Sequence, residues 1–183
     1  MKTVKFTAIA LAAILSAVAI PALAQVMVGG APMYANKDIV DNAVNSKDHT
    51  TLVAAVQAAG LVPTLKGAGP FTVFAPTNAA FAALPAGTVD NLLKPENKAA
   101  LTKVLTYHVV AGKLETAALI KAVDAGGGKA TLTEVSGGTL TVTKSGTMIM
   151  LSDESGGMAH VTIPDVVQSN GVIHVVDKVL LPK

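Results

Sequence analysis

Hydrophobic residues in the first half of the chain recur every three or four positions, the spacing that is typical of helices with one buried face. The clearest series begins after Asp48, the expected N-cap, ends before Gly60, and consists of Leu52, Ala55, Val56 and Ala59. The helical segments that the pattern predicts are 48–60, 79–84, 95–107 and 114–123, with a short turn that begins at Thr88 or Asp90 and leads to Leu92 and Leu93. We therefore expect the first half to be mainly helical.

In the second half, apolar and polar residues alternate, which is typical of strands with one buried face. Thr131–Val135 and Thr139–Thr143 alternate on either side of Ser-Gly-Gly and predict a hairpin, and Asn170-Gly171 is a further tight-turn signal. The other strands expected are 71–75, 148–151, 159–163 and 172–176. Helices followed by strands favour an α+β fold with a largely antiparallel sheet or sandwich.

The N-terminus reads as a secretory signal peptide. Lys2 and Lys5 precede an uncharged run over residues 6–20, and small residues lead up to Ala24, where we expect cleavage. Residues 25–36 have Gly, Pro and scattered apolar positions without a period, which predicts a mobile or loosely docked N-terminal arm. The domain proper is expected to span 37–183. The exported protein would therefore be secreted or periplasmic.

The composition limits the number of domains and the classes of partner that the protein could have. Removing the 24-residue leader from the 183 residues leaves 159, a length suited to one domain with a single core. Losing Lys2 and Lys5 reduces the 14 basic residues to 12 against 12 acidic ones, so the mature net charge is zero. Every basic residue is Lys, so the bidentate fork of Arg is unavailable, which argues against a nucleic-acid partner. There is no Cys, so stability must come from packing.

No segment carries a strong catalytic or metal signature. The sequence has no G-x-S-x-G, no H-E-x-x-H and no cysteine nucleophile. Gly126–Lys129 lacks the other residues of a phosphate-binding loop and is better read as a flexible loop. The four histidines, far apart in the sequence, are His49, His108, His160 and His174. We expect no enzymatic activity, no cofactor and no metal site.

Three single residues have two interpretations each. His108, between Tyr107 and Val109, fits a neutral histidine that hydrogen-bonds two elements together, or else a ligand or proton-transfer group. His174 lies in an apolar strand and, by the same alternatives, fits a satisfied core position better. Asp165, after Pro164, fits a carboxylate that stabilises a turn, or one that contacts a partner.

Three blocks of sequence resemble the fasciclin-type (FAS1) domain. Residues 72–81 (TVFAPTNAAF) are similar to the family's first signature block, Tyr107-His108 to its central pair, and residues 170–182 (NGVIHVVDKVLLP) to its second block. The stretch 38–61 also resembles the family's opening helices, and all four occur in the expected order. The resemblance covers residues 37–182, nearly the whole mature chain.

This resemblance implies a wedge-shaped β-sandwich with helices packed around one side. It assigns an architectural role to Thr72–Phe81. The residues expected to hold the fold together are Thr77, Asn78, Tyr107, His108, Asn170 and His174. In animal matrix members an Asp-Ile pair just before the second block has been tied to integrin binding, and Asp165-Val166 stands at that place here. Val replaces Ile, and no Arg-Gly-Asp occurs in the chain.

The leading hypothesis is a secreted or periplasmic, monomeric, non-catalytic module that mediates adhesion or surface association through a protein or glycan, with Asp165 and Val166 as the partner-binding residues. One alternative is a small ligand-binding protein or enzyme with a pocket near Tyr107 and His108. Another is a structural envelope or stress protein without a discrete ligand.

Overall fold

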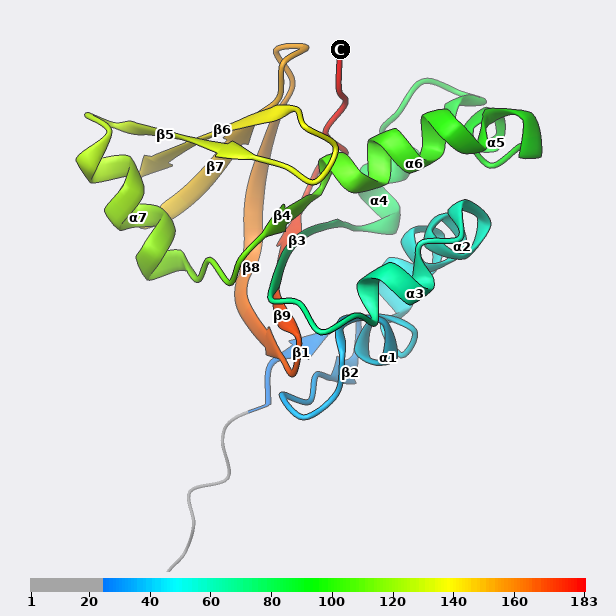
Figure 1. Cartoon of the computed structure of the whole chain (residues 1–183), viewed down its shortest axis with the longest axis horizontal. Helices are drawn as coiled ribbons and strands as arrows, with labels where there is room; N and C mark the ends of the chain where they lie inside the picture. Colours follow the sequence, from blue (N-terminus) through cyan, green and yellow to red (C-terminus); the bar gives the residue numbers. More distant parts are fainter. Residues whose placement is uncertain (1–24) are drawn as a thin grey trace, which may run out of the picture.

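A single mixed sheet runs through the computed structural model, which describes residues 25–183 (Figure 1). The predicted signal peptide, 1–24, lies outside the described residues. The sheet has seven strands in the order β4-β3-β9-β8-β7-β6-β5. In chain order the strands are β3 (Phe71–Pro76), β4 (Val109–Ala111), β5 (Lys129–Thr133), β6 (Thr139–Ser145), β7 (Met148–Ser152), β8 (Met158–Gln168) and β9 (Gly171–Val176). Among these strands, only β3 and β9 pair in parallel.

Helices cover this sheet unequally. Figure 1 shows most of them gathered on one side, with α7 alone on the other. The helices are α1 (Ile39–Ala43), α2 (Thr50–Ala59), α3 (Val62–Leu65), α4 (Asn78–Ala82), α5 (Thr88–Leu92), α6 (Lys98–Tyr107) and α7 (Thr116–Ala125), with short 3-10 turns at Lys47–His49 and Pro95–Asn97. The predicted α+β fold is confirmed, and α7 is the exception to the one-sided helical layer.

The centre of the sheet joins the two ends of the domain sequence. β3 lies between β4 and β9, and Phe71 is paired with Gly171 in the parallel register. All six residues of β9 are buried because helices cover one face and α7 with the outer strands covers the other. The strand is accordingly apolar at every position except His174.

Two apolar clusters form the core on opposite faces of the central strands. One joins the helical layer to Val73, Ala75, Ile173 and Val175. The other lies against α7 and includes Phe74, Tyr107 and Val176, together with the inward residues of β6 and β7. Because neighbouring strand residues point to opposite faces, Val73 and Phe74 belong to different clusters. A single strand thus ties both halves of the core together.

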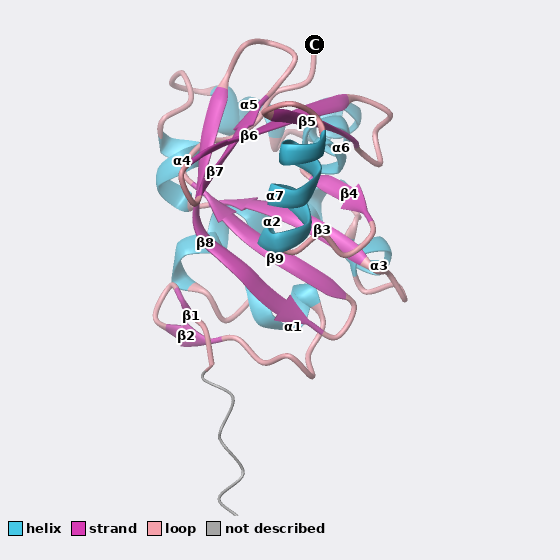
Figure 2. Ribbon diagram, turned by 90° about the vertical axis from the view of Figure 1, so that its left-hand side faces the viewer, coloured by secondary structure: helices cyan, strands magenta, loops and turns pink. Residues whose placement is uncertain are grey.

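The strand β8 connects the two halves of the sheet. It pairs with β7 at its start and with β9 along most of its length, and its register with β9 shifts between Val161 and Ile163 and again between Ile163 and Val166. Figure 2 shows β8 beside β9, with β7 on its other edge. At the far end, Val110 of β4 forms a bridge with Glu134 just after β5. The predicted sandwich is therefore one bent sheet that nearly closes on itself.

The N-terminal arm is not loosely docked, contrary to the expectation from its sequence. Its strands β1 (Met27–Val28) and β2 (Ala31–Pro32) form a small hairpin, and Val28 and Met33 are buried in the helical cluster. The Tyr34 amide also donates to Asn42 Oδ1 at 3.0 Å. Within residues 25–183, no helix has both the length and the apolar character of a membrane span.

Candidate partner-binding site at Asp165

Asp165 lies at the bulge of β8 and adopts a left-handed backbone conformation, with φ of 55°. Asp is one of the few residues other than Gly that tolerate this region. Its Oδ1 accepts a hydrogen bond of 2.6 Å from the Thr116 amide, in the first turn of α7. This carboxylate oxygen satisfies one of the free amides at the start of the helix. No other described residue bonds Oδ2, and Asp165 is half-buried.

His174, on the neighbouring strand β9, holds the backbone of Asp165 in place. The Asp165 amide donates to His174 Nδ1 at 3.3 Å, so the other ring nitrogen, Nε2, carries the proton and donates to the Leu114 carbonyl at 2.7 Å. His174 also stacks on Phe74, with ring centroids 5.6 Å apart. Burial lowers the pKa of His174, against the opposing effects of the Leu114 carbonyl and the Asp165 charge. The neutral ring links β8, β9 and the approach to α7.

The two residues named as partner-binding differ in accessibility. Val166 is 1% exposed and packs in the helical cluster, so in this conformation it cannot touch a partner. Asp165 follows the exposed Pro164 and adjoins the start of α7. There, Lys113, Glu115 and Lys121 line a shallow open depression, and Lys113 pairs with Glu115 at 2.8 Å. The accessible polar groups in this region are therefore the Asp165 carboxylate and these charged side chains.

His108 is bonded through both ring nitrogens. The Leu180 amide donates to Nε2 at 3.0 Å, so Nδ1 carries the proton and donates to the Val104 carbonyl at 2.8 Å. Burial lowers the pKa of His108 to about 4, although the Val104 carbonyl and the charge of Asp153 favour the protonated form. The imidazole is therefore neutral near pH 7. It links α6 to the C-terminal segment and has no nitrogen left for a ligand.

Tyr107, the last residue of α6, and Glu134, which follows β5, lie close to the start of β4. The Tyr107 hydroxyl donates to the Thr139 carbonyl at 2.7 Å and accepts from the Glu154 amide at 3.1 Å, and burial raises its pKa to about 12. Glu134 is 4% exposed, and its Oε1 has no hydrogen-bond partner among the described residues. Burial raises the pKa of Glu134 to about 8. A sequence pattern gives no sign that this glutamate is buried.

Thr77 and Asn78 cap two different helices. The Thr77 hydroxyl accepts from the Ala80 amide at 3.2 Å and so caps α4. Asn78 Oδ1 accepts from the Thr51 amide at 3.0 Å, while its Nδ2 donates to the Lys47 carbonyl at 2.8 Å. Asn78 therefore supplies the side-chain cap of α2, for which the sequence indicated Asp48. The first signature block joins a core strand to two helix starts.

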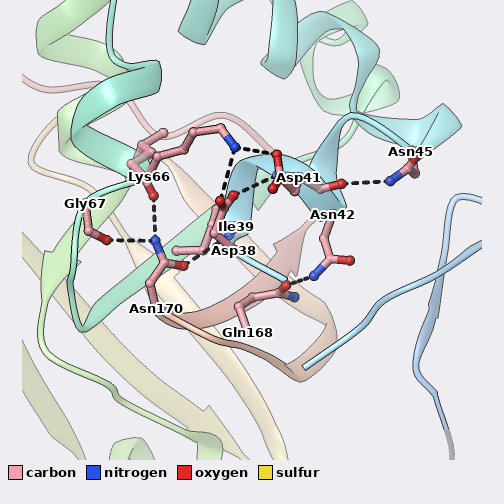
Figure 3. A network of polar contacts seen from close by, with 10 residues as sticks. Asp38, Ile39, Asp41, Asn42, Asn45, Lys66, Gly67, Gln168 and Asn170 are labelled. Atoms are coloured by element: carbon pink, nitrogen blue, oxygen red, sulfur yellow. Dashed lines mark hydrogen bonds and ion pairs between the residues drawn. The ribbon is translucent and has the colours of Figure 1, made fainter. Parts of the chain in front are cut away.

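Asn170 holds the turn between β8 and β9 against the helical layer (Figure 3). Its Oδ1 accepts from the Ile39 amide at 3.1 Å, and its Nδ2 donates to the carbonyls of Leu65 at 2.7 Å and Gly67 at 3.0 Å. Beside it, buried Asn42 donates to Gln168. The sequence pattern singled out Asn170 as a turn residue. It did not indicate the contact between Asn42 and Gln168, because the sequence around an isolated Asn or Gln does not show which residue it will bond.

Comparison with known proteins identifies the family of this chain. The model of the fasciclin domain matches residues 47–182. The chain belongs to the fasciclin-domain family. The four histidines, the two capping residues and the Asp165 bulge all lie within the matched residues of this fasciclin domain.

Relatives of this fasciclin domain come from bacteria and animals. Protein sll1483 of Synechocystis is 51% identical over 146 residues, covering 79% of this chain and 73% of that protein. Immunogenic protein MPB70 of Mycobacterium bovis is 36% identical and covers 97% of this chain and 93% of its own length. Transforming growth factor-beta-induced protein ig-h3 of Sus scrofa is 37% identical over 72% of this chain, which is 17% of that protein.

A solved structure shares the fold. The FAS1 domain pair of the insect cell adhesion molecule fasciclin I superposes with a TM-score of 0.69 over 79% of this chain and 51% of that chain, at 17% sequence identity. At this identity, the likeness concerns the fold alone.

A cavity in the helical half of the fasciclin domain is lined in part by two histidines, but it is small. It measures about 50 Å³, is lined mainly by aliphatic side chains, and borders both His49 and His108. Pockets for drug-sized ligands are roughly 300–1,000 Å³. Tyr107 is not part of its lining. Within residues 25–183, no group of three His, Cys, Asp or Glu side chains is placed to hold a metal ion. The alternative of a pocket using Tyr107 and His108 gains no support.

Proposed function

We propose that this fasciclin domain is an exported, non-catalytic binding module that acts in adhesion or surface association through a protein or glycan partner. The observation that carries the proposal is the family match over residues 47–182. One relative supports it through its name: MPB83 of Mycobacterium bovis, 33% identical over 84% of this chain and 64% of its own length, is a cell surface glycolipoprotein. The leader-like residues 1–24 support export.

The chemistry of the described histidines supports a binding role over catalysis. His49, His108 and His174 are buried, and burial lowers the pKa of each. His108 and His174 use both ring nitrogens in hydrogen bonds within the fold. A general base must present a free nitrogen to its substrate. Only His160 is substantially exposed among the four.

We place the contact surface at Asp165 and the charged start of α7. The test measures binding of residues 25–183 to an array of matrix proteins, glycans and bacterial envelope fractions. Asp165→Asn is the sharper variant, because Asn keeps an oxygen for the Thr116 amide and tolerates positive φ while losing the charge. Asp90→Asn, on exposed α5, is the matched control.

Loss of specific binding in Asp165→Asn, with binding by Asp90→Asn unchanged, supports both the proposed binding function and the placement of the contact surface at Asp165. Equal binding by all three proteins moves the surface elsewhere, and binding to no fraction favours a structural envelope protein. With a mature net charge of zero, we expect contacts at short range and a weak dependence on salt. Affinity that collapses between low and moderate salt would contradict this expectation.

A further inference from the structure

Three of the six methionines of the chain lie on the outer face of β7 and β8. Met148 is 52% exposed and Met158 is 46% exposed, and Met150 is half-buried beside them. The residues between them, Ile149, Leu151 and Ala159, point inward and are buried. Single exposed apolar residues are common on proteins, but three thioethers on one face of two adjacent strands are not explained by core packing.

The strand register places a histidine at the centre of these methionines. Met150 on β7 lies directly opposite His160 on β8, and Met158 lies opposite Ser152. Directly opposite residues share a face with Cβ atoms about 4.5–5.5 Å apart, and diagonal neighbours are about 7–8 Å apart. Met148 and Met158 each stand two residues along a strand from this pair, on the same face. Flexible methionine side chains span such distances.

His160 is held in an orientation that leaves one nitrogen open. Its Nδ1 lies 3.0 Å from Asp177 Oδ2, and its amide donates to Asp177 Oδ1 at 2.7 Å. A carboxylate oxygen accepts hydrogen bonds, so in this pair the proton lies on Nδ1. No described residue bonds Nε2, and the ring is 39% exposed.

This arrangement is the one that metal-binding histidines use. A ligating imidazole almost always donates its second N–H to a carboxylate or carbonyl, which fixes the tautomer. Thioethers are soft ligands and favour Cu(I), whereas Mg²⁺ and Ca²⁺ require oxygen ligands. The chain has no Cys, so no thiolate competes for a soft ion.

We propose that Met150 Sδ and His160 Nε2 bind one Cu(I) ion at the outer face of β7 and β8, with the thioethers of Met148 and Met158 completing its coordination. Asp177 is a positioning residue that acts through His160. The site lies away from Asp165 and does not depend on the proposed adhesive function. Because the ion binds in its reduced form, no electron transfer is required.

The first test titrates anaerobic Cu(I) into residues 25–183 in competition with bicinchoninate. We expect one Cu(I) per chain. Met150→Leu, which conserves volume, and His160→Gln should each weaken binding at least tenfold, and Asp177→Asn by about tenfold, as is usual for the carboxylate behind a ligating histidine. Met27→Leu is the control, because Met27 is equally exposed, at 55%, but lies on β1.

A redox-inert probe identifies the ligands directly. On adding Ag(I) to protein labelled at the methionine methyl groups, the signals of Met148, Met150 and Met158 should shift, while those of Met27 and Met33 should not. The proposal is wrong if Cu(I) does not compete with the chelator, if Met27→Leu loses as much affinity as Met150→Leu, or if Zn²⁺ displaces Cu(I) at equal concentration.

Discussion

His108 connects α6 to the C-terminal segment through one neutral ring. Replacing it with Ala leaves the Leu180 amide and the Val104 carbonyl without partners in a buried site. We expect His108→Ala to lower the free energy of unfolding by about 1–3 kcal/mol. Urea unfolding followed by circular dichroism measures the change, with the exposed Lys94→Ala as control. Equal stability of the two variants would mean that the bonds to His108 are dispensable.

Glu134 makes stability depend on pH. Its folded-state pKa of about 8 lies above the ordinary value of 4.5, so between these values the folded protein holds a proton that the unfolded chain has released. The contribution of Glu134 therefore falls as pH rises from about 4.5 to about 8, and is constant outside that window.

Glu134→Gln removes this contribution because Gln does not titrate. As pH rises through that range, the difference in unfolding free energy between the variant and the native protein should move in favour of the variant. Taking the difference cancels groups that titrate in both proteins, such as His108. Parallel stability curves from about pH 4.5 to about pH 8 would show that Glu134 is not buried as described.

At the scale of elements, β3 contributes to both apolar clusters at once. Phe74 is fully buried in the cluster against α7 and stacks on His174. We expect Phe74→Ala to cost about 3–5 kcal/mol of unfolding free energy, the usual range for deleting a buried aromatic ring. Thermal and urea unfolding check this value. A loss below about 1 kcal/mol would contradict the core position of the strand.

Elements with local signals could be predicted from the sequence, and those defined by distant contacts could not. Gly60 ends α2 with φ of 73°, as its position indicated, because a left-handed cap depends only on nearby residues. The strand expected at 159–163 stops before Pro164, yet β8 continues to Gln168, because the bulge leaves Pro164 and Asp165 out of the pairing with β9 and the pairing resumes at Val166. Val28 and Met33 gave no period, although tertiary packing buries both.

The same limit applies to the candidate sites. Asp165 was singled out by its flanking residues, but the bond to Thr116 joins two segments that no local pattern connects. The burial of Val166 follows from the bulge and the helical layer. Met150 and His160 are adjacent only because of the register between β7 and β8, which a sequence alone does not determine.

At the scale of the whole molecule, the fold depends on its last strand. β9 lies between β3 and β8 in the sheet, so a fragment of residues 25–170 would leave the facing edges of both strands unpaired. We expect this fragment to show no cooperative unfolding transition, in contrast to residues 25–183, because both apolar clusters lose the buried side chains of β9. Calorimetry distinguishes the two proteins, and a sharp transition in the fragment would contradict the central role of β9.

The parallel pairing of Phe71 with Gly171 also bears on the order of events during biosynthesis. The partner of β3 leaves the ribosome about a hundred residues after β3 itself, and contacts so distant in sequence slow folding. A growing chain can therefore form helices early but cannot complete its core until translation is almost finished. In the exported protein that we propose, a precursor that stays incompletely folded until then would still fit through a translocation channel, and the arrangement of the central strands would favour folding after export.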